Sequence, residues 1–558
     1  MLLGVVASWL LWASAVPFGE APDEPSHLEV AQFVATHGRL PAFGPHGDMY
    51  VRLDQIGIPI ESHALAPPLT YLVDAVLIRV LPVAPPVAVR LGSLLAALAA
   101  VGLAYAFVRA VLPGQRGLAL AVAALVAAVP QFSFQAAVAN SDIVALATAL
   151  AASTLALRAS GPLGYLSLGV AVGCALLAKY TAYPAAAIAC LVAGWRVCVT
   201  RPGRWPRAAG LLGLVALGAA VVGGPWLAHN WRLYGEPWPL TTSEAAFRAS
   251  VPATLAVAAP GLRRLWEPDY LPSWAIITFR SFWAGFDRVS LFAPGWVYVA
   301  VLVALAVAGV GLGRLFVAER RVRATAVLDS PAGLLLVGWP PTTLLAAVAM
   351  SLGRYYPVHG RYLLPLLPVV VLALAVGWRA VVPERWAALA PWALVAGMLA
   401  LNAYCLLGVV VPHYYGPAAA RVTLTVDSPR PGDVATQSVT IRGWAVVAGR
   451  PAWQPDLVGG PPAWYLPAAS VWATVDGEQV ADLVGGAGAT RPDVARALDA
   501  PAVTRAGFDY QWDAGDAGHG MHTVEVCAAD PSAAEASCVP LPIEVPGVAG
   551  AAGPSGLR

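Results

Sequence analysis

The sequence predicts a mainly α-helical membrane protein with about eleven transmembrane helices, followed by a C-terminal all-β domain. Of its 558 residues, 58% are hydrophobic and only 12% are charged, about half of the roughly 25% that soluble domains carry. Apolar runs of about 20 residues, the length that crosses a bilayer, recur along the chain with short arginine clusters between them. The net charge of +2 and the absence of a continuous basic face give no indication of nucleic-acid binding.

The first apolar run, residues 1–16, is predicted to be a retained helix, because it lacks the basic start and small-residue cleavage site of a signal peptide. The next run, APPLTYLVDAVLIRVLPVAPP, is bracketed by prolines and contains Asp74 and Arg79. Charged residues are costly in a bilayer, so we interpret this run as an interfacial or re-entrant helix. The other predicted spans are residues 88–108, 117–136, 142–157, 162–179, 182–196, 208–227, 293–313, 331–351, 362–378 and 387–411.

The positions of arginine support this topology. If the amino terminus is cytoplasmic, each predicted cytoplasmic turn carries at least one arginine, as the positive-inside rule requires. A full span at the proline-bracketed run would move all later clusters to the other side. The odd number of spans then places the first loop (18–87), a long loop (228–292) and the chain after the last span outside the cytoplasm. Residues 1–411 are expected to form one polytopic membrane domain.

The polar segment 420–546 predicts a small extracytoplasmic β-sandwich of immunoglobulin-like type. Stretches such as SVTIRGWAVV and SVWATVDGEQV are rich in β-branched residues and are separated by Gly, Pro and Asp turns. One of them contains the hairpin dipeptide DG, and a series of such short strands is typical of that architecture. Cys527 and Cys538 could form a disulfide if the domain lies outside. The Ala/Gly-rich end, 547–558, is predicted to be disordered.

This topology gathers unusual polar residues on the outer face. Asp23, Glu24 and His27 lie in the first loop, Asp142 begins a span, and Lys179, the only lysine in the chain, ends another. Each has a simpler explanation. An acidic residue at a helix start can cap the helix, a histidine is more often solvated or packed than a ligand, and a lysine at a helix end can reach the head groups. Their convergence favours a polar cavity at the bilayer edge that holds an amphiphile.

Five runs occur in order along the chain: APDEPSHLEVAQFVATHGRLP, ESHALAPPLTYLVDA, NSDIVALATALAAS, LLAKYTAYPAA and HGRYLLPLLP. In order and spacing they resemble the membrane-integral GT-C glycosyltransferases, in particular the bacterial branch related to protein mannosyltransferases and aminoarabinose transferases and the membrane proteins with a PDEP-type signature. The resemblance extends over residues 1–411. It implies a cell-envelope enzyme of the bacterial cytoplasmic membrane that takes a sugar from a polyprenyl-phosphate donor, with inversion, in an extracytoplasmic active site.

The resemblance also implies roles for individual residues. Asp23 would be the general base, with Glu24 as its alternate or orienting partner, and Asp142 would hold the acceptor or align the base. Lys179 and Arg361 would face the leaving phosphate, which an arginine can bind through two oxygens. The weaker donor-phosphate candidates are His63 and Tyr71, and possible further members of the site are His27 and Arg354.

Two points about this site stay open. His63 departs from the commoner family pattern, in which proline follows the histidine more closely, because three residues intervene here. A divalent ion between Asp23, Glu24 and His27 is chemically possible, since such ligands suit hard or borderline metals. The spacing matches no metal motif, however, and no metal is assigned. The acceptor could be a protein, a lipid or a polysaccharide.

Two other functions fit the same composition. A transporter or flippase of lipid-linked saccharides would need charges near the bilayer midplane and a pair of similar halves, whereas the candidates here lie at outer helix ends. A non-catalytic cell-envelope scaffold would bind a glycan through the β-rich tail, and its function would survive replacement of Asp23.

Overall fold

The chain folds into two compact units, one that ends at Val410 and one that begins at Val411. The computed structural model describes residues 2–50, 52–53, 59–60, 63–199, 205–250, 270–320, 330–353, 359–415, 420–430, 432–435, 438–449, 464–483, 489–498, 500–530, 533 and 535–546. The predicted disordered end, 547–558, lies outside this part of the chain.

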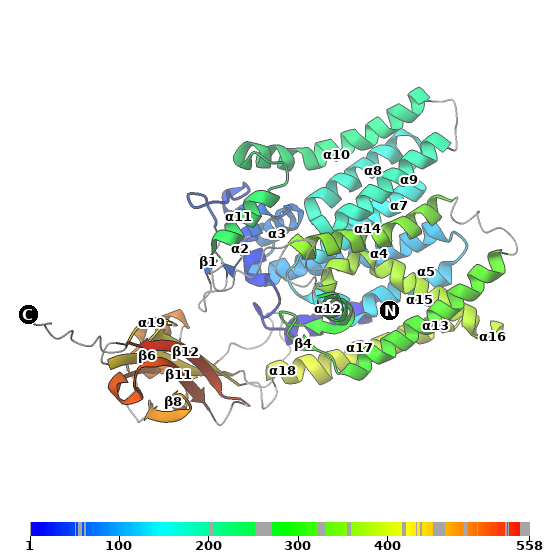
Figure 1. Cartoon of the computed structure of the whole chain (residues 1–558). Coiled ribbons are helices and arrows are strands. Elements are labelled where there is room, and N and C mark those ends of the chain that lie inside the picture. Colours follow the sequence, from blue (N-terminus) through cyan, green and yellow to red (C-terminus); the bar gives the residue numbers. More distant parts are fainter. Residues whose placement is uncertain are drawn as a thin grey trace, which may run out of the picture. The chain divides into compact units, whose positions relative to one another are not determined.

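The first unit is almost entirely helical (Figure 1). Its main helices are α1 (Leu2–Ala15), α2 (Glu24–His37), α3 (Leu69–Val80), α4 (Pro85–Val111), α5 (Arg116–Ala128), α6 (Pro130–Ala137), α7 (Asp142–Arg158), α8 (Gly161–Ala178), α9 (Tyr183–Val199), α10 (Trp205–Tyr234), α11 (Leu240–Ser250), α12 (Tyr270–Ala284), α13 (Gly295–Arg320), α14 (Pro331–Gly353), α15 (Leu367–Val381), α16 (Glu384–Ala387) and α17 (Ala390–Cys405), with α18 (Val411–Tyr415) just beyond the unit. Shorter elements are η1 (His63–Leu65), η2 (Tyr180–Ala182), η4 (Gly360–Leu366), η5 (Leu406–Val410) and the two-residue strands β1 (Arg52–Leu53), β2 (Pro59–Ile60), β3 (Gly285–Phe286) and β4 (Leu291–Phe292).

The mainly helical class is confirmed, and each predicted span falls on a helical segment. Among the described residues, eight helices are long and apolar enough to cross a membrane, or nine if the bent pair α5 and α6 is one span. The helices α1, with 14 residues, and α7, with 17, are shorter than these eight. The count of eleven spans therefore stays a prediction.

The predicted span 117–136 is bent in its middle. The helix α5 ends at Ala128, α6 begins at Pro130, and their axes differ by 64°. Proline has no backbone hydrogen to donate and disfavours helical backbone at the residue before it. Val129 is accordingly extended, with φ −62° and ψ 127°. The break gives the short helix α6 a direction of its own beside the candidate site.

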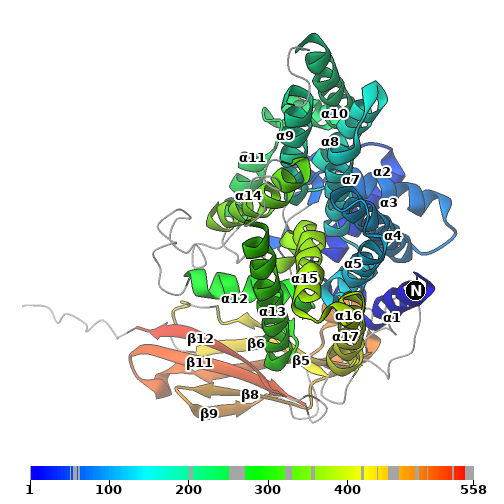
Figure 2. The ribbon, with the colours of Figure 1, turned by 90° about the vertical axis from the view of Figure 1, so that its right-hand side faces the viewer.

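Small residues let neighbouring helices approach closely. The helices α8 and α10 lie side by side (Figures 1 and 2), and a Cβ added at Gly169 of α8 would lie 2.3 Å from the carbonyl oxygen of Val215 in α10. A Cβ added at Gly218 of α10 would likewise lie 2.8 Å from the backbone of α8, and α13 meets α15 in the same way at Gly311 and Gly377. Such contacts are typical of membrane helices, which gain stability from close backbone packing.

The proline-bracketed run forms α3, a 12-residue helix that packs against α2 and α4. At about 1.5 Å per residue it is too short to cross a bilayer. Asp74 on this helix is only 2% exposed and faces Gly92 of α4, where an added Cβ would clash with its carboxylate. Burial raises the pKa of Asp74 well above its ordinary value. The folded state therefore binds the Asp74 proton more tightly than the unfolded state does.

This difference predicts how stability changes with pH. A raised folded-state pKa contributes stability at pH values below the unfolded value of about 3.9, and that contribution is lost as the pH rises through the folded value. Wild-type protein should thus lose thermal stability between pH 5 and pH 8 relative to Asp74→Asn, and the variant should be the more stable of the two at pH 8. Thermal unfolding in detergent at both pH values measures this, and parallel shifts of both proteins would contradict it.

The second unit contains two four-stranded sheets around a common core. One has the order β10-β6-β5, with β7 also paired to β6, and the other has the order β12-β11-β8-β9; the pairings are antiparallel. The elements are β5 (Arg421–Ser428), β6 (Ser438–Gly449), β7 (Trp464–Pro467), β8 (Ser470–Val475), β9 (Glu478–Asp482), α19 (Pro492–Ala497), η6 (Pro501–Arg505), β10 (Gly507–Asp513), η7 (Ala514–Ala517), β11 (Gly520–Ala529) and β12 (Ser537–Val545).

Side chains from both sheets fill this core, among them Ile441, Phe508 and Val524. Cys527 and Cys538 lie opposite each other on β11 and β12 and form a disulfide. The prediction of a β-rich C-terminal region is confirmed, and its assignment to the immunoglobulin-like type stays a prediction.

Candidate active site

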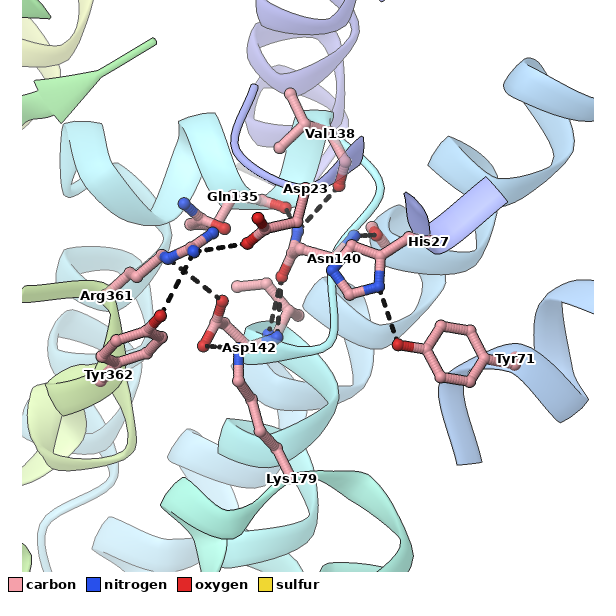
Figure 3. Close-up of polar contacts among 12 residues, drawn as sticks. Asp23, His27, Tyr71, Gln135, Val138, Asn140, Asp142, Lys179, Arg361 and Tyr362 are labelled. Carbon is pink, nitrogen blue, oxygen red and sulfur yellow. Dashed lines mark hydrogen bonds and ion pairs between the residues drawn. The ribbon is translucent and has the colours of Figure 1, made fainter. Parts of the chain in front are cut away.

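Four charged side chains from distant parts of the chain meet at one group of helix ends (Figure 3). Arg361 Nη2 donates to Asp23 Oδ2 at 2.7 Å, and Lys179 Nζ donates to Asp142 Oδ1 at 2.8 Å. The second carboxylate oxygen of Asp142 lies 4.0 Å from Arg361 Nε, so the two pairs form one network. These residues lie at the starts of α2, α7 and η4 and at the end of α8. The structure thus brings together four of the predicted site residues.

Asp23 is the residue just before α2, and its backbone is left-handed with φ 64°. Pro25 in the first turn fixes φ at a helical value and has no backbone hydrogen to leave unpaired, which favours a helix start here. The Asp23 carboxylate makes no capping hydrogen bond and binds Arg361 instead, with 39% of the side chain exposed. The capping alternative is therefore wrong for Asp23, and its side chain is accessible to a ligand.

Asp142 lies in the first turn of α7, where the helix dipole stabilises a carboxylate. The helix start is capped by Asn140, whose Oδ1 accepts the backbone N–H groups of Asp142 at 2.9 Å and of the next residue at 3.2 Å. The Asn140 amide donates in turn to the carbonyls of Gln135 and Val138. Asp142, 1% exposed, is thereby left to bind Lys179. Asn140 is absent from the predicted site, although an asparagine just before a helix is a capping signal.

Lys179 and Arg361 form one cationic wall. Lys179 follows the end of α8 in extended backbone, and its ammonium group points to Asp142, which contradicts the head-group alternative. The Arg361 side chain is only 5% exposed. Both cations lie over the ring of Tyr362, at 5.0 and 5.2 Å from its centroid. Contacts between cations and aromatic rings stabilise partly desolvated charges of this kind.

Gly360 determines where Arg361 lies. A Cβ at this position would be 2.1 Å from the backbone nitrogen of Phe282 in α12, so only glycine lets η4 approach that helix. The Gly360 N–H donates to Ser281 Oγ at 2.7 Å and completes the contact. The glycine of the run HGRYLLP is therefore required for the close approach that places the arginine after it.

Burial and Arg361 together set the charges of the site. Partial desolvation by the surrounding helices would by itself raise the pKa of Asp23, but the Arg361 guanidinium holds the pKa of Asp23 well below its ordinary value. Burial lowers the pKa of His27, and the neighbouring His63 adds to this effect. At neutral pH Asp23 is thus a carboxylate and His27 a neutral imidazole.

His27 and Tyr71 lie on the side of Asp23 away from Arg361 (Figure 3). His27 Nδ1 is 3.0 Å from the Tyr71 hydroxyl, and the rings of His27 and His63 have centroids 4.4 Å apart. The predicted phosphate contacts Tyr71 and His63 thus gather around His27 rather than around the two cations. Their role in phosphate binding stays a prediction.

A carboxylate and two imidazoles lie close enough to share an ion. Ligand atoms of Asp23, His27 and His63 are within 4.8 Å of one another, and this set suits a divalent metal. Glu24 does not belong to it, so this set differs from the combination of Asp23, Glu24 and His27 considered from the sequence. Asp23 is already paired with Arg361, and His27 with Tyr71. No metal is assigned to this set.

Glu24 and Arg90 form a second, buried ion pair beside the site. Arg90 Nε and Nη2 donate to the two carboxylate oxygens of Glu24 at 2.8 and 2.9 Å. The same oxygens accept the backbone N–H groups of Gly19 and Ala139, and Arg90 Nη1 donates to two carbonyls at the end of α1. Both oxygens of Glu24 are occupied and the residue is 0% exposed. The predicted use of Glu24 as an alternate base does not fit this geometry, whereas an orienting role does.

Three further residues near the network are, like Asn140, absent from the predicted site. Arg90 lies within the predicted span 88–108, where a lone arginine in an apolar run is a signal of function or structure. Gln135 on α6 and His359 before η4 lie beside Arg361, and no sequence pattern marks Gln135. Arg354, a predicted possible member, lies outside the described residues.

Residues 66–222, from just before α3 into α10, match the family model described as dolichyl-phosphate-mannose-protein mannosyltransferase. The resemblance to the GT-C membrane glycosyltransferases is confirmed. The segment of this GT-C-like chain that matches contains Asp142 and Lys179, whereas Asp23 and Arg361 lie outside it. The family match and the apolar helices together indicate a multi-pass membrane protein.

Two crystal structures of ArnT from Cupriavidus metallidurans are similar to the GT-C-like chain. The apo structure is 16% identical, with 72% of this chain and 63% of that chain covered and a TM-score of 0.42. The structure bound to undecaprenyl phosphate is 17% identical, with 77% and 81% covered and a TM-score of 0.35. The GT-C-like chain thus spans less than two thirds of the first structure. No curated protein matches it.

Proposed function

We propose that the chain is an inverting glycosyltransferase of the bacterial cytoplasmic membrane, which moves a sugar from a polyprenyl-phosphate donor to a hydroxyl group of an extracytoplasmic acceptor. The observation that carries the proposal is the network in which the accessible carboxylate Asp23 lies beside the cations Arg361 and Lys179. Direct displacement of a sugar from phosphate needs a base for the attacking hydroxyl and cations for the departing phosphate.

In the proposed reaction the acceptor oxygen bonds to the anomeric carbon while the bond from that carbon to the phosphate oxygen breaks. The proton of the acceptor hydroxyl passes to Asp23, and the bonding electron pair leaves with the phosphate. Arg361 presents a planar fork to two phosphate oxygens, and Lys179 adds a point charge. Asp142, buried and bound to Lys179, would hold the two cations in place and so align the base.

Two observations support an extracytoplasmic site. The disulfide between Cys527 and Cys538 fits an oxidising compartment, and the arginine-rich turns fit a cytoplasmic location under the predicted topology. Nucleotide sugars are confined to the cytoplasm, so an outward-facing transferase requires a sugar carried on lipid. The acceptor is proposed to be a protein, a lipid or a polysaccharide of the cell envelope.

Purified membranes that contain the full chain can be incubated with a panel of polyprenyl-phosphate sugars, with membranes that lack the chain as the control. We expect one donor to be consumed, with release of polyprenyl phosphate and an inverted glycosidic bond in the product. Donor that crosses the membrane without being consumed would support the flippase alternative instead.

Lys179→Ala tests the cationic wall. A hydrogen bond to a charged group contributes about 1.5–3 kcal/mol, so we expect the donor KM to rise by at least roughly tenfold. Lys179→Arg should retain more of the donor affinity, because it keeps the charge. Arg379→Ala is the matched control, since Arg379 is an exposed cation that binds Gln115. Unchanged donor kinetics in Lys179→Ala, with the fold intact, would contradict a phosphate contact.

A further inference from the structure

A narrow pocket opens beside Arg361, between α6, the β3–β4 hairpin and η4. Its wall includes Phe134, Gln135, Asp287, His359 and Arg361. The space between these side chains and the exterior amounts to about 180 Å³, but in this conformation it is too narrow to enclose a water molecule, so a ligand group can enter only if the side chains move apart.

Several buried polar atoms of the residues that line this pocket make no hydrogen bond within the described part of the chain. Gln135 is 0% exposed, yet neither its amide oxygen nor its amide nitrogen makes a hydrogen bond. His359 Nδ1 and Arg361 Nε are likewise buried without a hydrogen-bond partner. By contrast, Gln131 on the same helix accepts the Gly285 N–H at 2.9 Å. Buried polar groups are rarely left without hydrogen-bond partners in folded proteins. These unpaired atoms therefore indicate a ligand that forms hydrogen bonds with them.

The hydrogen-bond donors and acceptors of Gln135 and His359 indicate the kind of ligand. An amide offers both a donor and acceptors, and a neutral imidazole offers one of each. Burial, together with the adjacent Arg361, lowers the pKa of His359 to about 4, so its ring is uncharged at neutral pH. A hydroxyl group also donates and accepts at once. The pair Gln135 and His359 therefore matches neutral hydroxyl groups better than a second phosphate.

The hairpin that closes the pocket is held in an unusual backbone conformation. Asp287 has φ 55° and Val289 has φ 64°, and a β-branched residue in the left-handed region is a genuine outlier. Strained residues of this kind collect at ligand-binding and catalytic sites. The hairpin adds the Asp287 carboxylate, a hydroxyl acceptor, to the wall that carries Gln135.

We propose that this pocket binds hydroxyl groups of the sugar that is transferred, and that Gln135 and His359 determine which sugar is accepted. The inference rests on the proposed function, because Arg361 would hold the phosphate to which that sugar is attached. The ring would then extend from Arg361 toward the two residues on the pocket wall. Gln135 and His359 are thus assigned to sugar specificity, and Arg361 and Lys179 to the phosphate.

Two variants test the assignment independently. Gln135→Met keeps the length of the side chain and removes its polar atoms. His359→Phe keeps the ring that stacks on Tyr362, whose centroid is 5.8 Å away. For each variant, kcat and KM are measured for the donor, for epimeric donors and for the acceptor, together with inhibition by polyprenyl phosphate that carries no sugar. Gln115→Met on the surface is the matched control, and thermal unfolding verifies each fold.

We expect each variant to lower kcat/KM for the preferred donor by roughly tenfold, the effect of losing one or two hydrogen bonds, and to narrow the preference between epimers. Inhibition by polyprenyl phosphate and the acceptor KM should stay at wild-type values. Unchanged donor selectivity in both folded variants would overturn the proposal. A change confined to the acceptor KM would assign the pocket to the acceptor and overturn it as well. If wild-type protein consumes no donor at all, the proposed function itself fails, and the pocket assignment with it.

Discussion

Asp23→Asn is expected to lower the rate of sugar transfer by about 10²–10⁴-fold, the contribution typical of a positioned general base. The amide has the shape of the carboxylate but cannot take the proton of the acceptor. Donor binding should persist or become tighter, because Arg361 loses its carboxylate partner and keeps its charge for the phosphate. The loss should therefore appear in kcat with little increase in the donor KM. Single-turnover transfer with saturating donor, beside equilibrium binding of polyprenyl phosphate, measures the two effects separately.

Asp48→Asn provides the matched control. Asp48 lies in the same loop and pairs with Arg39 at 2.7 Å, but this pair is exposed and outside the network. Its replacement should leave transfer unchanged. Full transfer activity in a correctly folded Asp23→Asn protein would contradict the assignment of Asp23 as the base.

Arg90→Ala is expected to lower the free energy of unfolding by about 3–5 kcal/mol, because it leaves the Glu24 carboxylate buried without its cation. It also removes the donor that binds the carbonyls of Ala13 and Val16 at the end of α1. Urea or thermal unfolding in detergent measures the loss. Amide hydrogen exchange should become faster in α1, α2 and α4 together, since this ion pair links the three helices.

A double variant distinguishes charge from packing in this pair. Replacing Arg90 by methionine and Glu24 by leucine removes both charges and keeps much of the volume, and such replacements often restore stability. We expect the double variant to be more stable than Arg90→Ala and to retain less transfer activity than wild type, because the start of α2 also carries Asp23. Equal stability of wild type and Arg90→Ala would show that the pair contributes nothing.

Part of the candidate site could be predicted because helix order restricts where its residues lie. Asp142 begins one predicted span and Lys179 ends the next, so both must lie on the same side of the membrane. Their ion pair at 2.8 Å agrees with this expectation. Arg361 begins a later span on that side, and Asp23 precedes α2. Apolar length and the order of charges carry this information, and both can be read along the chain.

The sequence does not distinguish the positions of the two adjacent carboxylates. Asp23 and Glu24 are neighbours in the sequence, yet one binds Arg361 in an accessible site and the other is buried against Arg90. The left-handed backbone of Asp23 and the first turn of α2 send the two carboxylates in different directions. The direction of each carboxylate cannot be predicted from residue types and spacing alone, because it depends on where α4 and η4 pack.

The sequence by itself determined the helical segments, the β-rich end and the grouping of the charged helix ends, because hydrophobic length and periodicity act locally. Only the tertiary structure decided which of those charges touch. It turned α6 at Pro130 and brought Gln135 beside Arg361, and it paired Glu24 with an arginine 66 residues away. Contacts between distant segments depend on close packing at positions such as Gly360 and Gly92. A glycine in the sequence does not by itself reveal which segment packs against it.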